Sequence, residues 1–539
     1  MKNPPVKSIG QELLQRVYNQ RIWGKIICHF DEDAEKEDIN TRVQVSLITV
    51  KTLEADWNFI QGEETGASYK PYFFEFFADV NMSYTTEQEF LRKNNGKILR
   101  VYLRKTEPVP SENSIVLSGH LLTAASPIRR QGYYLEITKE DDIGKFVSNT
   151  LKWILKRKKK IPLLREGMKK IILNADKNPF ARIDKEIQSF FQSPICGGSI
   201  YNVGQGNFVR FYMDSNESFL FDAGMTTHKD SNTKITTARA EIRGIQPQLI
   251  ILSHWDIDHI IGIAEIDNDK IYEDTIWIAP NPLLLGDEKT SFSAARLCLY
   301  LLRKNRISLL HQGKNANPLN ADETTSSGGK VTKYCQNNFE LFQGNGKDDS
   351  NGRRNNIGLI LRIRLKDSLN YNALFAGDCS FEQMPEELKD GCYAFLLTAH
   401  HGSKNALPND VYSDGNGLAV ISYGKNSHGH PDKEHTNALK KNRFLDDCWE
   451  TKDAIRIDFY FDRDYILASR IQNWEDTWWT TKYTKGTILF PINFQMNRTL
   501  YNPKLWRLQW NPNLWILHFD SKLWMILWEK SQKPPTHLT

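Results

Sequence analysis

Four potential metal ligands stand within six residues in the stretch LSHWDIDHIIG, at 252–262. The stretch begins at the end of the apolar residues 249–252, which are typical of a buried strand. Imidazole and carboxylate groups crowded at a strand end can hold two divalent cations roughly 3.5–4 Å apart, as in many hydrolytic sites. The alternative is a polar loop that contains two histidines by chance. The four residues are His254, Asp256, Asp258 and His259.

Strands that end in polar loops recur on both sides of this stretch, as a site of this kind requires. SIYNVGQGNFVRFYM and SFLFDAG indicate a pair of strands, DTIWIAP another strand, and IIGIAEI the start of a helix. IGLILRIRL, YNALFAGD, AFLLTAHHGS and GLAVISYG indicate four more strands. Strands alternating with helices predict an α/β domain whose polar residues gather along one edge of its sheets.

The stretch 254–259 resembles the signature of the metallo-β-lactamase superfamily, H-x-H-x-D-H, with Asp256 in place of the second histidine. That variant is similar to the lactamase-like domain of the bacterial competence protein ComEC. Other segments resemble motifs of that domain in family order over about residues 199–493. They are VGQGNF (203–208), FDAG (221–224), RRNNIGLILRI (353–363), FAGD (375–378), AHHGSKN (399–405), SYGKNSHGHP (422–431) and TKYTKGTILF (481–490).

The resemblance implies an αβ/βα sandwich and a role for each matched residue. His254 and Asp256 would hold one metal, and Asp258 and His259 the second. Asp378 would bridge both, because a carboxylate at a strand end can give one oxygen to each cation. Asp222 (in FDAG) is expected to support the loop through hydrogen bonds rather than to bind metal.

The histidines of the later motifs complete the predicted site. His400, His401 and His430 are candidates for the remaining ligand positions or for phosphate contact, with His400 placed among the ligands. Asp258 would orient the attacking water, and His401 or His430 would protonate the leaving oxygen. The histidine of the family's third motif has no clear counterpart, so the third ligand of the first metal stays open.

The ligand set favours metal-dependent hydrolysis of a phosphodiester. Two divalent cations are expected, Zn²⁺ or Mn²⁺ with Mg²⁺ as a further option, because the harder ligand Asp256 shifts preference away from zinc. The main interpretation is a nuclease acting on DNA or RNA; the resemblance also extends, by analogy, to bacterial defence against phage. The alternatives are a hydrolase of a small phosphodiester or other ester, or a docking component of a protein complex.

The composition is that of a soluble globular protein with two or three domains: 539 residues, 40% hydrophobic and 25% charged. No apolar run reaches the roughly 18–20 residues that a membrane span needs, and the N-terminus lacks the apolar core of a secretory signal. A cytoplasmic protein without membrane contact is therefore expected. The seven cysteines form no C-x-x-C pair, so a metal must use histidine and carboxylate.

Four regions are expected along the chain. Residues 1–145 form a mostly β domain of unknown role, 146–198 a basic helical connector, 199–495 the lactamase-like domain, and 496–539 a tryptophan-rich tail. Residues 152–170 of the connector contain nine Lys or Arg against one Glu. This run is either a solvated helix face or a contact for a polyanion such as nucleic acid.

The tail repeats one nine-residue unit three times: NPKLWRLQW (502–510), NPNLWILHF (511–519) and DSKLWMILW (520–528). Each unit is typical of a turn followed by a short strand. An aromatic face shared by the three strands would be costly to leave in water. We expect it to be covered by the N-terminal domain, or by a protein partner or second copy of the chain; stacking on nucleic-acid bases is a further alternative.

Overall fold

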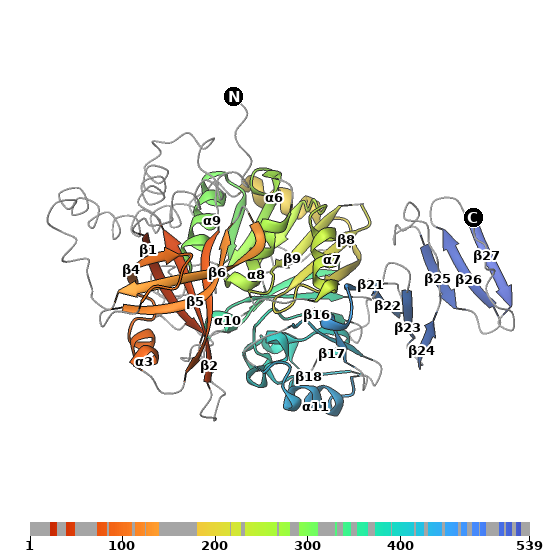
Figure 1. The fold of residues 1–539 in the computed structure, drawn as a ribbon. Coiled ribbons are helices and arrows are strands. Elements are labelled where there is room, and N and C mark those ends of the chain that lie inside the picture. Colours follow the sequence, from red (N-terminus) through yellow and green to blue (C-terminus); the bar gives the residue numbers. More distant parts are fainter. Residues whose placement is uncertain are drawn as a thin grey trace.

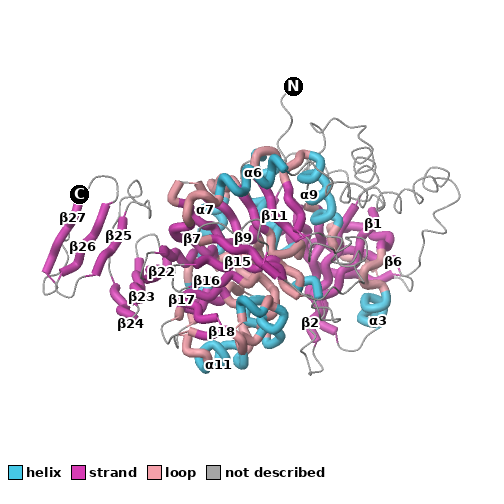
Figure 2. Tube along the Cα trace, turned by 180° about the vertical axis from the view of Figure 1, so that it is seen from behind, coloured by secondary structure: helices cyan, strands magenta, loops and turns pink. Residues whose placement is uncertain are grey.

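The computed structural model (Figure 1) is mixed α/β and rich in strands, as the tube in Figure 2 shows. No helix in the described part of the chain is long and apolar enough to cross a membrane. The structure describes residues 22–29, 39–48, 73–82, 86–109, 114–123, 126–138, 181–215, 217–227, 232–266, 269–280, 290–310, 329–330, 338–345, 353–364, 372–389, 391–413, 417–424, 429–444, 448–461, 465–471, 477–483, 486–491, 506–510, 514–519 and 524–529.

A closed barrel of antiparallel strands forms the N-terminal part of the fold. Alternate residues of its second strand, Val43, Val45 and Leu47, are buried in the barrel core, as the period of two in a strand requires. This architecture is compatible with the expected β domain. The order around the barrel is β1 (Ile22–His29), β2 (Ile39–Ile48), β3 (Phe74–Met82), β5 (Ser114–Thr123), β6 (Ser126–Thr138) and β4 (Ile98–Arg104), and α3 (Thr86–Lys93) lies between β3 and β4 in the chain.

The expected connector is described from residue 181 onward. Helix α6 (Ala181–Phe190) is followed by strand β7 (Ile195–Tyr201), which begins ahead of the expected domain start at Ser199. Phe191, after the helix, stacks on Phe339 with ring centroids 3.7 Å apart, and so attaches α6 to the domain that follows. The basic run at 152–170 lies outside the described residues.

The first of two large sheets carries the strand that precedes the predicted ligands. Residues 199–223 supply three strands of it and not the expected pair, because a turn around Gly204 and Gly206, both with positive φ, splits the first segment. β9 to β12 run parallel, so their carboxyl ends share one edge. The order is β12 (Ile307–Leu310), β11 (Ile276–Pro280), β10 (Leu249–Ile251), β9 (Ser218–Ala223), β8 (Phe208–Met213), β7, β21 (Arg456–Phe461), β22 (Tyr465–Ile471), β23 (Thr477–Tyr483) and β24 (Gly486–Pro491).

The second sheet carries the motifs between residues 353 and 424, whereas the last motif (481–490) lies on β23 and β24 of the first sheet. Neighbouring strands β16, β17, β19 and β20 run parallel, so their carboxyl ends also share one edge. The four strands expected between residues 357 and 424 are β15, β16, β17 and β19. The order is β13 (Gly329–Lys330), β14 (Phe339–Gln343), β15 (Leu359–Arg364), β16 (Asn372–Phe375), β17 (Gly391–Leu397), β19 (Leu418–Ile421) and β20 (Trp449–Glu450), with β18 (Val411–Tyr412) paired to β17.

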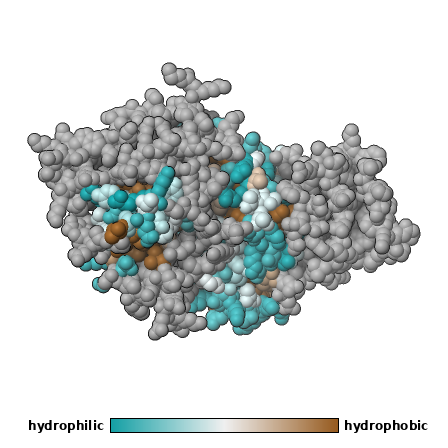
Figure 3. Space-filling view, in the orientation of Figure 1, coloured by the Kyte–Doolittle hydropathy of each residue, from teal (hydrophilic) through white to brown (hydrophobic). Residues whose placement is uncertain are grey.

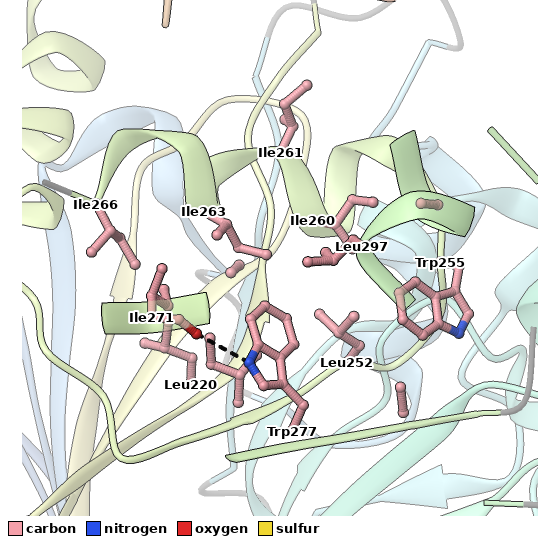
Figure 4. Close-up of a cluster of buried hydrophobic side chains, with 14 of the residues drawn as sticks. Leu220, Leu252, Trp255, Ile260, Ile261, Ile263, Ile266, Ile271, Trp277 and Leu297 are labelled. Atoms are coloured by element: carbon pink, nitrogen blue, oxygen red, sulfur yellow. Dashed lines mark hydrogen bonds between the residues drawn. The ribbon is translucent and has the colours of Figure 1, made fainter. Parts of the chain in front are cut away.

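One apolar core joins the two sheets, and helices add cores on their other faces. Phe211 of the first sheet meets Phe375 of the second edge to face, with ring centroids 4.8 Å apart. Figure 4 shows the core beneath the helices of the first sheet, where Trp277 is fully buried and its indole N–H donates to the Ile271 carbonyl at 3.3 Å. Leu439 packs in a further core on the second sheet. The helices are α7 (Thr233–Ile242), α8 (Ile257–Ile260), α9 (Phe292–Arg303), α10 (Arg353–Asn356) and α11 (Lys433–Lys441).

The tail forms a separate three-stranded antiparallel sheet of β25 (Trp506–Trp510), β26 (Leu514–Phe519) and β27 (Trp524–Glu529). Each strand falls within one copy of the nine-residue unit or ends one residue after it. The backbone register pairs Trp510 with Trp515, and Trp515 with Trp528. This agrees with the expected turn-and-strand repeat. The side chains of this sheet lie outside what the structure describes, so the expected cover of its aromatic face stays a prediction.

Candidate metal centre

The predicted ligands lie at the carboxyl ends of parallel strands in both sheets. In the first sheet, β10 leads into His254, and α8 follows with Asp258 and His259. In the second sheet, β16 leads to Asp378 and β17 to the pair His400 and His401. The carboxyl ends of parallel strands are where α/β folds usually place their sites.

Close backbone approaches fix the turn that carries Asp258. A Cβ atom on Gly224 would lie only 1.8 Å from the Asp258 carbonyl oxygen, so no other residue fits there without a shift. The neighbouring Met225 N–H donates to that same oxygen at 3.0 Å. Across the site, Gly377 has φ +56°, and a Cβ there would lie 2.6 Å from the Ser253 side chain. The glycines of FDAG and FAGD thus let three loops meet around the ligands.

Asp222 ties the ligand loop to the end of β9. Its carboxylate is fully buried and accepts from the Ser253 N–H at 2.6 Å and the Ser253 hydroxyl at 2.8 Å. His259 Nδ1 donates to the same carboxylate at 2.8 Å. The residue adopts a left-handed backbone, φ 58°, which costs energy for a residue with a side chain and is compensated by these bonds. Asp222 therefore supports the loop through hydrogen bonds, as the sequence predicted.

Three buried imidazoles turn their Nε2 atoms toward Asp378. His259 Nε2 lies 3.2 Å from Asp378 Oδ1, and His401 Nε2 lies 3.7 Å from that oxygen. His254 Nε2 lies 3.8 Å from Oδ2 of the same carboxylate. Asp258 Oδ2 lies 3.9 Å from His401 Nε2 on the more open side. The structure thus gathers these five predicted residues around one point.

The other ring nitrogen of each imidazole is held by a hydrogen bond. His401 Nδ1 donates to the Ser422 carbonyl at 2.7 Å, and His259 Nδ1 donates to Asp222. His254 Nδ1 donates to the Ser253 hydroxyl at 2.9 Å, because that hydroxyl uses its own hydrogen on Asp222. In the neutral rings each Nε2 therefore presents a lone pair to the centre. Histidines that bind metals are oriented in this way.

The donor set fits a divalent cation. Nε2 lone pairs and a carboxylate oxygen repel one another unless positive charge lies between them. Ligand atoms at about 2.0–2.2 Å from a cation lie roughly 3–4 Å from each other, the range of separations seen here. In the described part of the chain, two groups bring three ligand atoms within 4.8 Å: His254, His259 and Asp378, and Asp258, His259 and His401.

The directions of the pKa shifts in the centre also fit a bound cation. Burial opposes ionisation of Asp378, but His259, His401 and His400 hold the pKa of its carboxyl well below its usual range. Burial likewise opposes the charged form of His259, yet Asp378 and Asp222 raise the pKa of this ring well above its ordinary value. Burial lowers the pKa of His401. The centre attracts positive charge, which a proton or a metal ion can supply.

The structure brings the expected ligand pairs close together and adds further neighbours. Asp256 Oδ2 is 3.8 Å from His254 Nε2, the same distance as that nitrogen has to Asp378 Oδ2. The His254 ring also lies against His259, with ring centroids 4.0 Å apart. His259 belongs to both ligand groups, one of which contains Asp258. His400 and His430 lie at the outer rim, half-buried, with ring centroids 5.7 Å apart. His400 Nε2 is 3.8 Å from Asp378 Oδ2.

Three residues that support the metal centre were not identified from the sequence. Ser253 and Ser422 orient histidine rings through a hydroxyl and a carbonyl, and nothing in their residue type marks such a role. His435 of α11 is buried, which lowers its pKa to about 4, and its Nδ1 donates to the Ser403 carbonyl at 2.9 Å. His435 thus holds the turn that follows His401. The position of Ser253 directly before His254 was the one available signal.

Comparison with known proteins places part of this domain in a family. Residues 201–274 match the family model of the metallo-beta-lactamase superfamily. This span contains Asp222 and the ligands of the first sheet. Among solved structures, a protein described as a new diphosphatase from the PhnP family is similar at 11% sequence identity, over 50% of this chain and 99% of that chain, with a TM-score of 0.26. No curated protein matches the chain.

Proposed function

Because residues 201–274 form a metallo-β-lactamase superfamily domain, we propose that this chain is a metal-dependent hydrolase of the αβ/βα type that cleaves phosphodiesters in nucleic acid. The observation that carries the proposal is the convergence of three buried Nε2 atoms on the Asp378 carboxylate. Two sheets with a shared apolar core and helix-covered outer faces support the sandwich arrangement.

Two divalent cations, Zn²⁺, Mn²⁺ or Mg²⁺, are proposed for the two ligand groups. His254 and His259 would hold one cation and Asp258 and His401 the other, with His259 close to both groups. Asp378 would serve both cations, and Asp256 and His400 would be outer ligands. A divalent cation in such a site lowers the pKa of water to about 7 and so supplies a nucleophile near neutrality. The carboxylates of Asp256 and Asp258 favour the harder metals of this set.

Residues of the chain are assigned to orienting the water and to protonating the leaving oxygen. Asp258 lies on the more open side of the centre, where its carboxylate would accept a hydrogen bond from the attacking water and so orient it. Both nitrogens of His401 are engaged, one by Ser422 and one at the centre, so this ring serves as a ligand more readily than as an acid. His430, half-buried beside His400 at the rim, is the residue we assign to protonation of the leaving oxygen.

The choice of substrate rests on the sequence. The basic run at 152–170 supports a polyanion over a small diester, because Lys and Arg that neutralise phosphates strengthen nucleic-acid binding. The role in phage defence rests on resemblance, and a cytoplasmic location stays a prediction. On the face drawn in Figure 3 the described residues are mostly hydrophilic, with some hydrophobic ones among them. A protein partner or second copy is proposed at the tail, because its sequence repeat predicts a shared aromatic face.

A cleavage assay tests the proposed function. The full-length chain, supplemented in turn with Mn²⁺, Zn²⁺ and Mg²⁺, is offered single-stranded DNA, duplex DNA, RNA, a cyclic dinucleotide and bis-p-nitrophenyl phosphate. We expect cleavage of at least one nucleic acid and of the small diester, and loss of both in Asp258→Asn. Cleavage of the cyclic dinucleotide alone would favour the small-substrate alternative. A folded, metal-loaded chain that cleaves none of them contradicts the proposal.

A further inference from the structure

The barrel contacts the two-sheet domain on the edge that carries the metal centre. Figures 1 and 2 show the barrel side by side with α9, whose N-terminus lies at the edge where β11 ends. Lys25 of β1 donates to the Thr290 carbonyl at 2.8 Å, just before α9. Phe292 N–H, in the first turn of α9, donates to the Ser46 hydroxyl of β2 at 2.9 Å. The barrel is therefore attached to the loops of the catalytic edge.

A second contact reaches the loop that follows β9. His120 of β5 is buried, and its Nε2–H donates to the Thr227 carbonyl at 2.7 Å. A register shift between Gly119 and His120 breaks the regular pairing of β5 with β6 at this point, and such irregularities redirect a side chain out of the sheet. The ring also stacks on Phe77 of β3, with centroids 5.5 Å apart and an interplanar angle of 25°.

This loop is the support for Asp258. Thr226 N–H donates to the Val203 carbonyl at 2.8 Å, and Met225 N–H donates to the Asp258 carbonyl at 3.0 Å. Met225 also shares one apolar core with Phe77 of the barrel. Residues 223–227 are thus fixed from one end by the barrel, and they fix the backbone of Asp258 at the other.

We propose that the barrel supports the metal centre through His120, which is a positioning residue for Asp258. This inference rests on the proposed function, because it assigns a role in the same site. His120 touches neither ligand atoms nor substrate. It acts by holding the Thr227 carbonyl, and through the loop the Met225 N–H, where Asp258 needs them.

Metal affinity and turnover of the full-length chain test the proposal. His120→Ala removes the donor. We expect about a 10-fold loss of Mn²⁺ affinity at the weaker-binding of the two metal positions, and a similar loss in kcat on bis-p-nitrophenyl phosphate. Residues that support metal ligands contribute on this scale. KM should change less than kcat. His120→Gln keeps an amide donor and should recover most of both. Ser118→Ala, an exposed position on the same strand, should leave both unchanged.

Amide hydrogen exchange separates positioning from folding. In His120→Asn, whose amide is too short to reach Thr227, the amides of 223–227 and 256–260 should exchange faster than in the wild type, while the barrel strands keep their protection. Unchanged exchange, Mn²⁺ affinity and kcat in a folded His120→Ala or His120→Asn chain would overturn the proposal. Faster exchange in a chain whose wild type cleaves no diester would instead retain the positioning role and refute the proposed function.

Discussion

Two buried polar clusters in this molecule differ in how their hydrogen-bonding groups are balanced. In the interface of the barrel with α9, the Glu75 carboxylate accepts from Gln44 at 3.0 Å, from Ser46 at 2.7 Å and from the Ser293 hydroxyl. In the metal centre, Nε2 lone pairs of His254 and His401 face the Asp378 carboxylate at 3.8 and 3.7 Å.

In the Glu75 cluster the carboxylate is matched by three hydrogen-bond donors and needs no added group. In the metal centre the hydrogen-bond acceptors outnumber the donors. A buried carboxylate with three donors is a stable feature of a protein interior. Acceptors that face acceptors at 3.7–3.8 Å are stabilised only by positive charge between them. The balance of donors and acceptors, rather than burial or the number of polar groups, therefore separates the candidate metal centre from a structural cluster.

The largest effect is expected from removing a ligand of the centre. Asp258→Ala or His259→Ala should lower kcat by about 10³-fold or more, because a lost cation removes several kcal/mol of transition-state stabilisation. Turnover of bis-p-nitrophenyl phosphate measures the loss, and circular dichroism checks that the variants fold. Glu75→Gln is the matched change in the other cluster. If the ligand variants fold and keep wild-type turnover, the comparison between the clusters fails.

A smaller effect is expected from displacing the ligand loop without touching a ligand. Gly224→Ala places a Cβ against the Asp258 carbonyl, so the turn must shift, and a misplacement of about 1 Å can lower the rate by about 10²-fold. Gly244→Ala is the control, since its Cβ would meet its nearest atom only at 3.8 Å. The ratio of kcat in the two variants is the readout, and equal rates would show that the close approach is not needed.

The barrel cluster should affect stability and not metal binding. In Glu75→Gln the amide NH₂ replaces one acceptor oxygen, so at least one of the three donors loses its partner, at a cost of about 1–3 kcal/mol in the free energy of unfolding. Chemical denaturation measures this change. The metal content should stay at the wild-type level; its loss would mean that the two clusters are not separate.

The smallest effect is a pH dependence of that stability. Burial raises the pKa of Glu75 above its ordinary value of 4.5, although its hydrogen-bond donors and Arg296 oppose the shift. The folded chain therefore binds a proton that the unfolded chain releases, and the free energy of unfolding contributed by Glu75 falls as the pH rises from about 4.5 through the raised pKa. The difference between wild type and Glu75→Gln should show this slope; a difference that does not vary with pH would contradict it.

Much of the metal centre could be predicted from local sequence, because its residues lie directly after strands that their apolar patterns reveal. His254, Asp258 and His259 were named in this way, and Asp378 was named because FAGD resembles a family motif. The structure brings the four together. The grouping of His254 with His259 could not be predicted, since it depends on how α8 turns. Which of the adjacent histidines is buried could not be predicted either. Both have left-handed backbones, with φ 47° at His400 and 55° at His401, which leave the first half-exposed and bury the second.

The contacts of the barrel with the two-sheet domain could not be predicted from its sequence. Strand patterns indicated a β domain, but His120 and Thr227 are 107 residues apart, and no local pattern encodes such a contact. Ser46 and Phe292 are 246 residues apart. These bonds form only once two separately patterned regions are packed together, so they depend on tertiary structure alone.

The metal content of the purified chain tests the central claim most directly. Wild type, Asp378→Asn and Glu75→Gln are loaded with Mn²⁺ or Zn²⁺, passed through gel filtration and measured by elemental analysis. We predict about two cations per chain in wild type and Glu75→Gln, as expected of a dinuclear hydrolytic site, and fewer in Asp378→Asn. A well-folded wild type that retains no metal, or an Asp378→Asn chain that retains as much as wild type, would contradict the account.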